Sequence, residues 1–181
     1  LMLAQRYGAS IVGVESDIGA AQQANANFEA SPWAGRMKAI HTTIQEYSST
    51  TKDQFDLIVS NPPFYQDHLQ SEGAKNIAIH ATELKQEDLL SCVLRLLKAK
   101  GAFWVLYPQY QFDQFRLMAE RSGLFVSHKV EVFNKIEEKP FRIIGSFSLE
   151  DSVLKKSSIV IRNEHDEYTE SLKSLTQDYY L

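Results

Sequence analysis

Apolar and polar positions along the first two thirds of the chain are arranged as short strands that alternate with helices. Short continuous apolar runs are typical of buried strands, and apolar residues recurring every three to four positions indicate one face of a helix. Strand followed by helix, repeated with short links, predicts an α/β fold with a doubly wound sheet. The expected strands are residues 10–15, 37–41, 55–60 and 102–107, and the expected helices are residues 1–8, 18–30, 84–98 and 110–122.

Local chemistry marks several of the expected boundaries. Asp17 precedes the second helix, where its carboxylate can accept from the free N–H groups of the first turn. Gly101 and Gly123 each follow a helical pattern and are expected to stop it. Residues 66–78 are polar without an apolar period, so we expect a loop there.

The last third of the chain changes character. Residues 126–132, 141–149 and 157–161 are expected strands with no helix between them, which favours antiparallel pairing. A short helix is expected from about Thr169 onward, and the whole chain, residues 1–181, is expected to form one domain. Because Leu1 falls within the last turns of a helix, we also expect that an N-terminal segment is missing from this chain.

Composition narrows the class of protein. The chain has 181 residues, of which 44% are hydrophobic and 23% charged, as in ordinary globular proteins. It has no apolar run of membrane-spanning length and no signal peptide pattern, and Cys92 is its only cysteine, so we expect a cytoplasmic protein. The five histidines lack metal-ligand spacing; we expect no metal, and we expect a monomer.

Charge is distributed unevenly along the chain. Residues 1–90 hold six Lys and Arg against eleven Asp and Glu, a net charge of −5. Residues 91–156 hold eleven Lys and Arg against seven Asp and Glu, a net charge of +4. A polyanion would therefore dock on the second half of the chain, although the same numbers also fit ordinary scatter on a solvated surface.

The sequence Asn61-Pro62-Pro63-Phe64 carries the most chemical information. It follows the strongest expected strand, which places it at the carboxyl edge of the sheet, where open α/β folds bind ligands. Two prolines restrict the backbone, so the side-chain carbonyl of Asn61 and the main-chain carbonyl of Pro62 can converge. Two fixed acceptors suit a planar NH2 group, and the ring of Phe64 offers a face on which a base can stack. Taken alone, the two prolines could equally be a turn after a strand.

This tetrapeptide resembles the (Asn/Asp/Ser)-Pro-Pro-(Tyr/Phe) motif of S-adenosylmethionine-dependent methyltransferases that modify amino or amide nitrogens. Gly13-Val14-Glu15-Ser16-Asp17 resembles the motif in which these enzymes hold the cofactor ribose with an acid after the second strand. The resemblance implies a Rossmann-like class I methyltransferase sheet, mostly parallel with antiparallel C-terminal strands. It also implies that the first strand and the glycine-rich motif precede Leu1. The implied cofactor-binding residues are Glu15, Ser16, Thr43, Ile44 and Asn61.

Within that superfamily the whole chain resembles the bacterial tRNA(Val) adenine-N6 methyltransferases, which modify the adenine following the anticodon. The segments that carry this resemblance are Ala81-Thr82-Glu83-Leu84, residues 101–108, Lys139-Pro140-Phe141-Arg142, Tyr168-Thr169 and residues 178–181. The implied activity is N6-methylation of an adenine in the tRNA anticodon loop, with Asn61, Pro62 and Phe64 as catalytic residues.

Candidate substrate contacts follow from this resemblance and from the charge distribution. Pro63 and Tyr65 adjoin the catalytic residues and are expected to line the substrate pocket. Basic residues of the net-positive region can meet RNA phosphates, although each lysine separately fits a solvated surface. These residues are Lys129, Lys135, Lys139 and Arg142, with Lys155 and Lys156 farther out.

Two other functions fit parts of the sequence. A glutamine N5-methyltransferase acting on a protein such as a release factor would use the same two acceptors, but that family usually has Tyr where this chain has Phe64. A non-catalytic RNA-binding domain would account for the absent glycine-rich motif, but it would leave residues 61–64 without a purpose. The adenine-N6 methyltransferase is therefore the preferred hypothesis.

Overall fold

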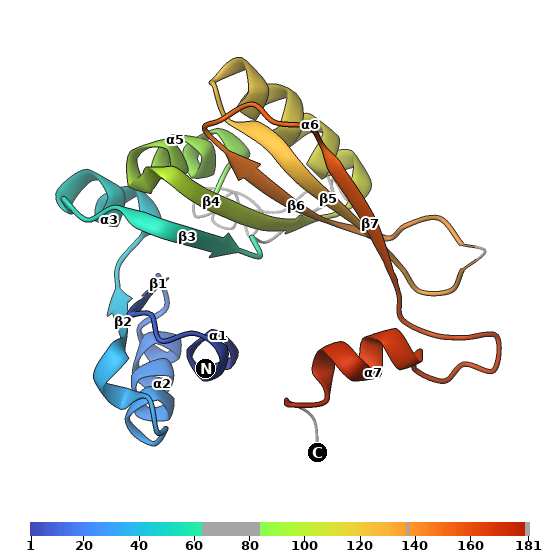
Figure 1. Cartoon of the computed structure of the whole chain (residues 1–181). Coiled ribbons are helices and arrows are strands. Elements are labelled where there is room, and N and C mark those ends of the chain that lie inside the picture. Colours follow the sequence, from blue (N-terminus) through green and yellow to red (C-terminus); the bar gives the residue numbers. More distant parts are fainter. Residues whose placement is uncertain (63–83, 137, 180–181) are drawn as a thin grey trace, which may run out of the picture. The chain divides into compact units, whose positions relative to one another are not determined.

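Every strand predicted before residue 125 is present in the computed structural model, which describes residues 1–62, 84–136 and 138–179. The chain divides into two units, residues 1–52 and residues 53–181 (Figure 1). Among the described residues, no helix combines the length and the apolar character that a membrane span requires.

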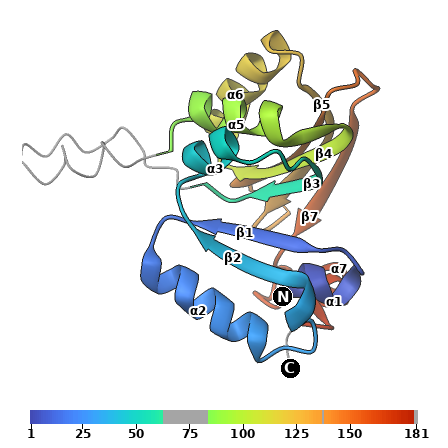
Figure 2. The ribbon, with the colours of Figure 1, turned by 90° about the vertical axis from the view of Figure 1, so that its left-hand side faces the viewer.

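The first unit contains a pair of parallel strands with a helix between them in the chain. Its elements are α1 (Met2–Arg6), β1 (Ile11–Glu15), α2 (Ile18–Glu29), the 3-10 turn η1 (Ala34–Arg36), β2 (Met37–His41) and α3 (Ile44–Thr50). Figure 2 shows α2 lying along the two strands. The predicted cap of α2 is confirmed, because the Asp17 carboxylate accepts from Ala20 N at 2.7 Å.

Two polar side chains connect the elements of this unit. The Asn25 amide in α2 donates to Ala39 O at 2.9 Å and accepts from Ala39 N at 2.8 Å, which ties the helix to β2. The Arg36 guanidinium donates to three carbonyl oxygens at the end of α1, those of Ala4, Tyr7 and Ala9. Because these carbonyls have no partner within the short helix, Arg36 completes its C-terminus.

The second unit is built on a five-stranded sheet with the order β3-β4-β6-β5-β7. The strands β3 and β4 are parallel, and β6 runs antiparallel to both β4 and β5. Consequently β3, β4 and β5 all end at the same edge of the sheet. The strands are β3 (Phe55–Ser60), β4 (Leu97–Tyr107), β5 (Phe125–Phe133), β6 (Arg142–Ser148) and β7 (Lys155–Val160), and the helices are α5 (Gln86–Leu96), α6 (Gln109–Arg121) and α7 (Glu170–Thr176).

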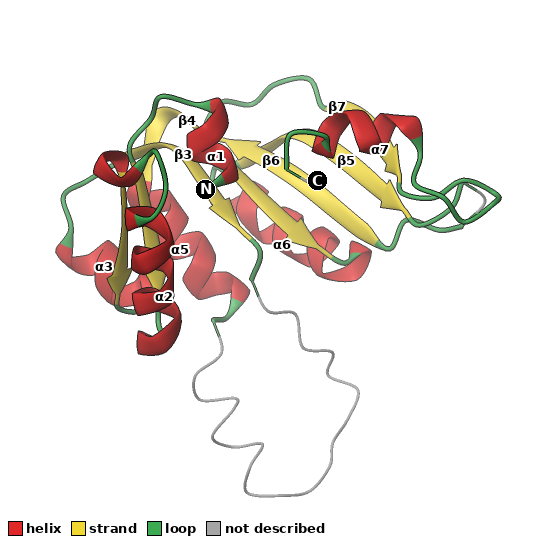
Figure 3. Ribbon diagram, turned by 90° about the horizontal axis from the view of Figure 1, so that it is seen from below, coloured by secondary structure: helices red, strands yellow, loops and turns green. Residues whose placement is uncertain are grey.

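Helices α5 and α6 cover one face of this sheet (Figure 1), and Figure 3 shows the other face. The core between helices and sheet is rich in aromatic rings: Phe103, Phe112, Phe115 and Phe147 are all at most 1% exposed. The rings of Phe115 and Phe147 meet edge to face with centroids 5.3 Å apart. Burial of this much apolar surface is the main stabilising contribution to the second unit.

One predicted boundary is wrong. The helix expected to run to Lys98 ends at Leu96, and β4 begins at Leu97 instead of Ala102. Leu97 pairs with Phe55 and Ala102 with Leu57, so β4 contains an irregular stretch between these two pairs. A Cβ atom on Gly101 would lie 2.9 Å from Phe55 O. Gly101 therefore permits close approach of two strands and does not stop a helix.

The expected antiparallel pairing is confirmed for β5 with β6 and wrong for β7, which pairs with β5 in parallel. Both edges of β6 are already occupied by β4 and β5, so β7 cannot pair with the strand that precedes it and pairs instead with the outer edge of β5. The link from Ser148 to Lys155 is short, which makes β7 run opposite to β6. Since β5 also runs opposite to β6, β5 and β7 are parallel.

Candidate active site

Asn61 and Pro62 directly follow β3, at the carboxyl edge of the five-stranded sheet. The last residue of the strand, Ser60, pairs with Val105 of β4, so Asn61 lies beside the end of β4. The Asn61 side chain is exposed, and Pro62 is buried. The structure thus presents the Asn61 amide at the edge where ligands bind in open α/β sheets.

Pro63, Phe64 and Tyr65 lie outside the described residues, as do the expected loop 66–78 and the segment 81–83. The stacking face of Phe64 and the pocket contacts of Pro63 and Tyr65 stay predictions. The convergence of the Asn61 and Pro62 carbonyls is likewise a prediction.

Tyr107 ends β4 at the same edge and is only 3% exposed. Burial raises the pKa of its phenol to about 12, against the opposing effect of a hydrogen bond with the Gln86 side chain. The Gln86 amide also donates to Gln111 O at 2.9 Å, which connects the start of α5 to α6. The Tyr107 phenol is therefore a neutral, buried part of this edge at physiological pH.

Three of the predicted RNA contacts lie at this edge too. Arg142 is the first residue of β6, which is the second neighbour of β3 in the sheet. With strands about 4.8 Å apart, the axes of β3 and β6 are about 10 Å apart, within the reach of one nucleotide. Lys135 and Lys139 lie in the connection between β5 and β6, which leaves the sheet at the same edge.

These basic side chains differ in their partners. The Arg142 guanidinium donates to Phe141 O at 2.8 Å and lies 5.4 Å from the centroid of the Phe141 ring. Lys135 is held by an ion pair with Asp166, at 3.2 Å. Lys139 is exposed. Of the three side chains, Lys139 is the most accessible to a phosphate. Lys135 would have to exchange the Asp166 carboxylate for a phosphate.

The predicted cofactor contacts of the first unit share one edge of the β1–β2 pair. Glu15 ends β1 opposite His41, the last residue of β2. Its carboxylate Oε1 accepts from Asp17 N at 2.9 Å.

Thr43 begins the turn after β2, and its hydroxyl accepts from Glu46 N at 3.2 Å as the N-cap of α3. Ser16 is exposed, and its carbonyl lies 3.2 Å from His41 Nε2. Ile44, the first residue of α3, is half-buried.

Comparison with known proteins decides between the functions left open by the sequence. A family model described as the methyltransferase small domain matches residues 1–123. A Bacteroides fragilis protein named tRNA1(Val) (adenine(37)-N6)-methyltransferase is 34% identical over 183 residues, 100% of this chain and 77% of its own length. A Trichodesmium erythraeum protein of the same name is 37% identical over 187 residues, with the same coverage. The chain belongs to this tRNA(Val) adenine-N6 methyltransferase family.

Solved structures agree with the fold expected for the tRNA(Val) adenine-N6 methyltransferase family. A protein from Agrobacterium tumefaciens, titled a predicted O-methyltransferase, superposes with a TM-score of 0.67 at 14% identity, over 93% of this chain and 77% of its own. The TehB-like SAM-dependent methyltransferase of Corynebacterium glutamicum gives 0.52 at 21% identity, over 80% and 71% of the two chains. The predicted Rossmann-like class I methyltransferase fold is confirmed.

Glu15 fits the ribose-binding role that the family resemblance implies for it. Oε1 is already occupied by the main-chain donor of Asp17, which orients the carboxylate. Among the described residues Oε2 has no hydrogen-bond donor, so this half-buried acceptor is available to a ribose hydroxyl. Within the part of the chain that the structure describes, no cluster of three or more His, Cys, Asp or Glu could hold a metal ion.

Helix α3 was missed by the sequence reasoning. Its start has a detectable signal, because Thr43-Ile44-Gln45-Glu46 matches the Ser/Thr-x-x-Glu pattern of a capping box. In the structure the Thr43 hydroxyl caps the helix, while the Glu46 carboxylate accepts from the Thr42 hydroxyl at 2.9 Å. Thr43 thus has a structural role whether or not it also contacts the cofactor.

Proposed function

We propose that this chain methylates N6 of adenine 37 in tRNA1(Val), the reaction for which its curated relatives are named, with S-adenosylmethionine as methyl donor. We further propose that it acts as one domain, as a monomer in the cytoplasm. The observation that carries the proposal is the position of Asn61-Pro62 at the carboxyl edge beside β4, in a chain matched over its whole length by these relatives.

The chain's own residues position the amine. The Asn61 side-chain oxygen accepts one hydrogen of the adenine amino group, and the Pro62 main-chain oxygen accepts the other. These two bonds rotate the nitrogen lone pair out of conjugation with the ring and direct it outward. Phe64 supports the adenine by stacking, which requires the base to leave the anticodon-loop stack.

S-adenosylmethionine would supply an electrophilic methyl group on a sulfonium, and the electron pair of the S–CH3 bond would stay on sulfur as the methyl passes to N6. Asn61 and Pro62 present the N6 lone pair to that methyl, and the proton lost by the methylated amine goes to water, so the chain needs no general base. Glu15 would hold the ribose of the donor, with Ser16, Thr43, Ile44 and Asn61 as further contacts.

Positively charged side chains at the same sheet edge hold the RNA backbone. Lys139 and Arg142 meet phosphates close to the target base, and Lys135 contributes when it exchanges Asp166 for a phosphate. This arrangement separates two tasks: Asn61 and Pro62 orient the reacting nitrogen, and the basic residues provide affinity that depends on salt.

The experiment is transfer of labelled methyl from S-adenosylmethionine to tRNA1(Val), with the label identified as N6-methyladenosine after digestion. Asn61→Ala is expected to lower turnover by about a hundredfold to a thousandfold or more, the usual cost of losing one donor or acceptor at the reacting group. Its stability should be unchanged, because the side chain is exposed. Gln54→Ala, an exposed polar residue before the other end of β3, is the matched control.

Two further arms test the substrate. A tRNA1(Val) with guanosine at position 37 lacks the 6-amino group and should take up no label. A release factor offered in place of tRNA should also stay unlabelled. Full activity of the Asn61→Ala protein, or label in the guanosine-containing tRNA or in the release factor, would contradict the proposal.

A further inference from the structure

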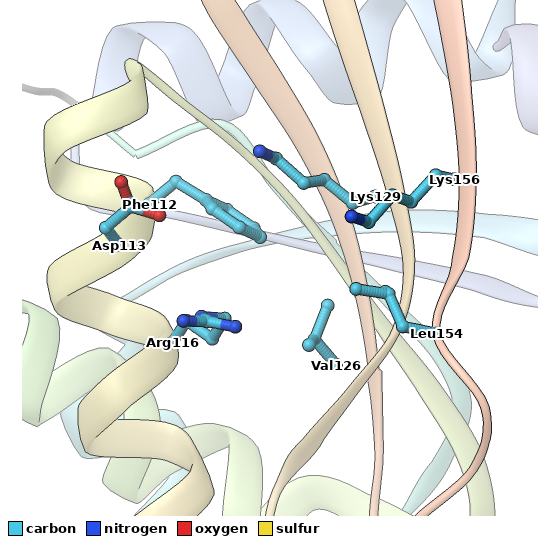
Figure 4. A pocket seen from close by; sticks show the side chains of 7 residues that line it. All are labelled: Phe112, Asp113, Arg116, Val126, Lys129, Leu154 and Lys156. Atoms are coloured by element: carbon cyan, nitrogen blue, oxygen red, sulfur yellow. The ribbon is translucent and has the colours of Figure 1, made fainter.

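A second candidate binding site lies in the five-stranded unit, on the face of the sheet covered by α6 (Figure 4). It is a pocket of about 150 Å³ between α6, β5 and β7. Phe112 and Leu154 contribute apolar walls, and Arg116, Lys129 and Lys156 contribute three positive charges. One carboxylate, that of Asp113, also lines the pocket.

The three cations come from three different elements: Arg116 from α6, Lys129 from β5 and Lys156 from β7. Lys129 and Lys156 are register partners on adjacent strands, so their side chains point to the same face of the sheet. Figure 4 shows the side chains of all three converging on one space. This convergence of like charge costs free energy in the absence of an anion.

The hydrogen-bonding capacity of these groups is only partly used. Lys129 is paired with Glu131 at 2.9 Å and lies 5.9 Å from the centroid of the Phe112 ring. The Asp113 carboxylate accepts from the Gln109 amide at 2.8 Å. Lys129 is thereby neutralised locally, and the Asp113 carboxylate is held by α6 itself.

Arg116 and Lys156 are different. Among the described residues, the nearest carboxylate oxygen to the Arg116 guanidinium is that of Glu120, at 3.9 Å. Its Nε is buried and has no hydrogen-bond acceptor among the described residues. Lys156 is exposed, and within the same residues it forms no ion pair. Within the described residues the amino groups of the Arg116 guanidinium form no hydrogen bond, and their only ion pair is the long contact with Glu120. These N–H groups and the Lys156 ammonium are therefore available to an oxygen ligand in the pocket.

We propose that this pocket binds a phosphate group of the RNA substrate, with Arg116 and Lys156 as its ligands. The proposal rests on the function proposed above. A guanidinium presents a planar fork of donors that matches phosphate, and Lys156 adds a point charge at the open side. The pocket has room for one such group together with water.

The position of the pocket predicts what it contributes. Three strand spacings of about 4.8 Å separate β3 from β5, so the pocket is about 14 Å or more from the Asn61 edge across the sheet. Lys129 also lies four residues before the end of β5, about 13 Å along the strand. A phosphate held here belongs to a nucleotide remote from the target adenine. The site therefore adds affinity for tRNA and leaves the chemical step unchanged.

The experiment compares Lys156→Gln and Arg116→Gln with Lys100→Gln. Lys100 is the matched control, because it is an exposed lysine of the same unit, near the start of β4, and does not line the pocket. Binding of tRNA1(Val) is measured by fluorescence anisotropy at several KCl concentrations between about 50 and 200 mM. Each pocket variant is expected to weaken binding about threefold to tenfold and to lower the slope of log K against log salt by about one. Lys100→Gln should retain the wild-type slope, and kcat at saturating tRNA should be unchanged in all three variants.

The outcomes separate the two proposals. If the wild-type protein methylates tRNA but Lys156→Gln and Arg116→Gln keep the affinity and slope of Lys100→Gln, the pocket proposal is wrong and the function stands. If the pocket variants bind tRNA like the control and the wild-type protein binds inorganic phosphate tightly, the pocket binds a free anion and the RNA assignment is also wrong. If the wild-type protein neither binds nor methylates tRNA, both proposals fail. Because Lys156 is exposed, a folding defect of Arg116→Gln would leave the Lys156 comparison decisive.

Discussion

Replacement of Gly145 by alanine tests the packing that joins the sheet to α6. Gly145 lies in the middle of β6, between Val105 of β4 and Lys129 of β5. A Cβ atom there would lie 2.3 Å from Cε2 of Phe112 and 3.0 Å from Cε2 of Phe147. An ordinary contact begins at 3.4 Å, so the Phe112 ring would have to move by 1.1 Å, the difference between 3.4 and 2.3 Å.

The ring has no space for that movement. Phe112 is 1% exposed and packs against Phe147, with ring centroids 5.9 Å apart. Overpacking of a core of this kind costs about 1–3 kcal/mol. For a chain of this size the melting temperature should fall by about 2–4 °C for each kcal/mol, hence by about 2–12 °C.

The assay is urea unfolding followed by far-ultraviolet circular dichroism, with Gly35→Ala as control because a Cβ atom on Gly35 has no neighbour within 4 Å. Gly145→Ala should lower the unfolding midpoint without changing the slope m. Combined with Phe112→Leu, which removes the clashing atoms, it should cost less than the sum of the two single changes. Wild-type stability of Gly145→Ala, or strict additivity with Phe112→Leu, would refute the packing argument.

Three further predictions follow from individual contacts. Asp17→Ala removes the cap of α2 and should lower the free energy of unfolding in urea by about 0.5–2 kcal/mol. Asp17→Asn keeps a capping oxygen and should retain most of that stability. Equal losses for the two variants would contradict the capping role. Because the phenol of Tyr107 has a pKa raised from 10.0 to about 12, the unfolded chain loses this proton first, and stability should fall as pH rises between these values. Tyr107→Phe should remove the highest step of the phenolate absorbance titration; an unchanged titration would show that another tyrosine is responsible. Asp166→Asn removes the carboxylate that pairs with Lys135 and keeps a residue type that tolerates the observed φ of 67°. This change should strengthen tRNA binding at low salt. Unchanged binding would exclude Lys135 as a phosphate contact.

The amino-acid sequence by itself determined the features that depend on neighbours in the chain. The carboxylate of Asp17 caps α2 because it is three residues from the N–H that it accepts from. Gly123 ends α6 with a φ of 80°, a conformation that other residues adopt only at a cost. The same locality places Asn61-Pro62 at the end of β3, since any residue after a strand lies at an edge of its sheet. The motif and its position were therefore readable without coordinates.

The tertiary structure alone decided the features that depend on which strands are neighbours. The start of β4 at Leu97 follows from its pairing with Phe55, which overrides the helical pattern of residues 84–98. The parallel pairing of β7 follows from the occupied edges of β6. Arg116, Lys129 and Lys156 are separated by 13 and 27 positions in the chain, and only the order β6-β5-β7 beneath α6 brings them to one pocket. Hydrophobic spacing reports whether a residue is buried, but it contains no information on the partner that buries it.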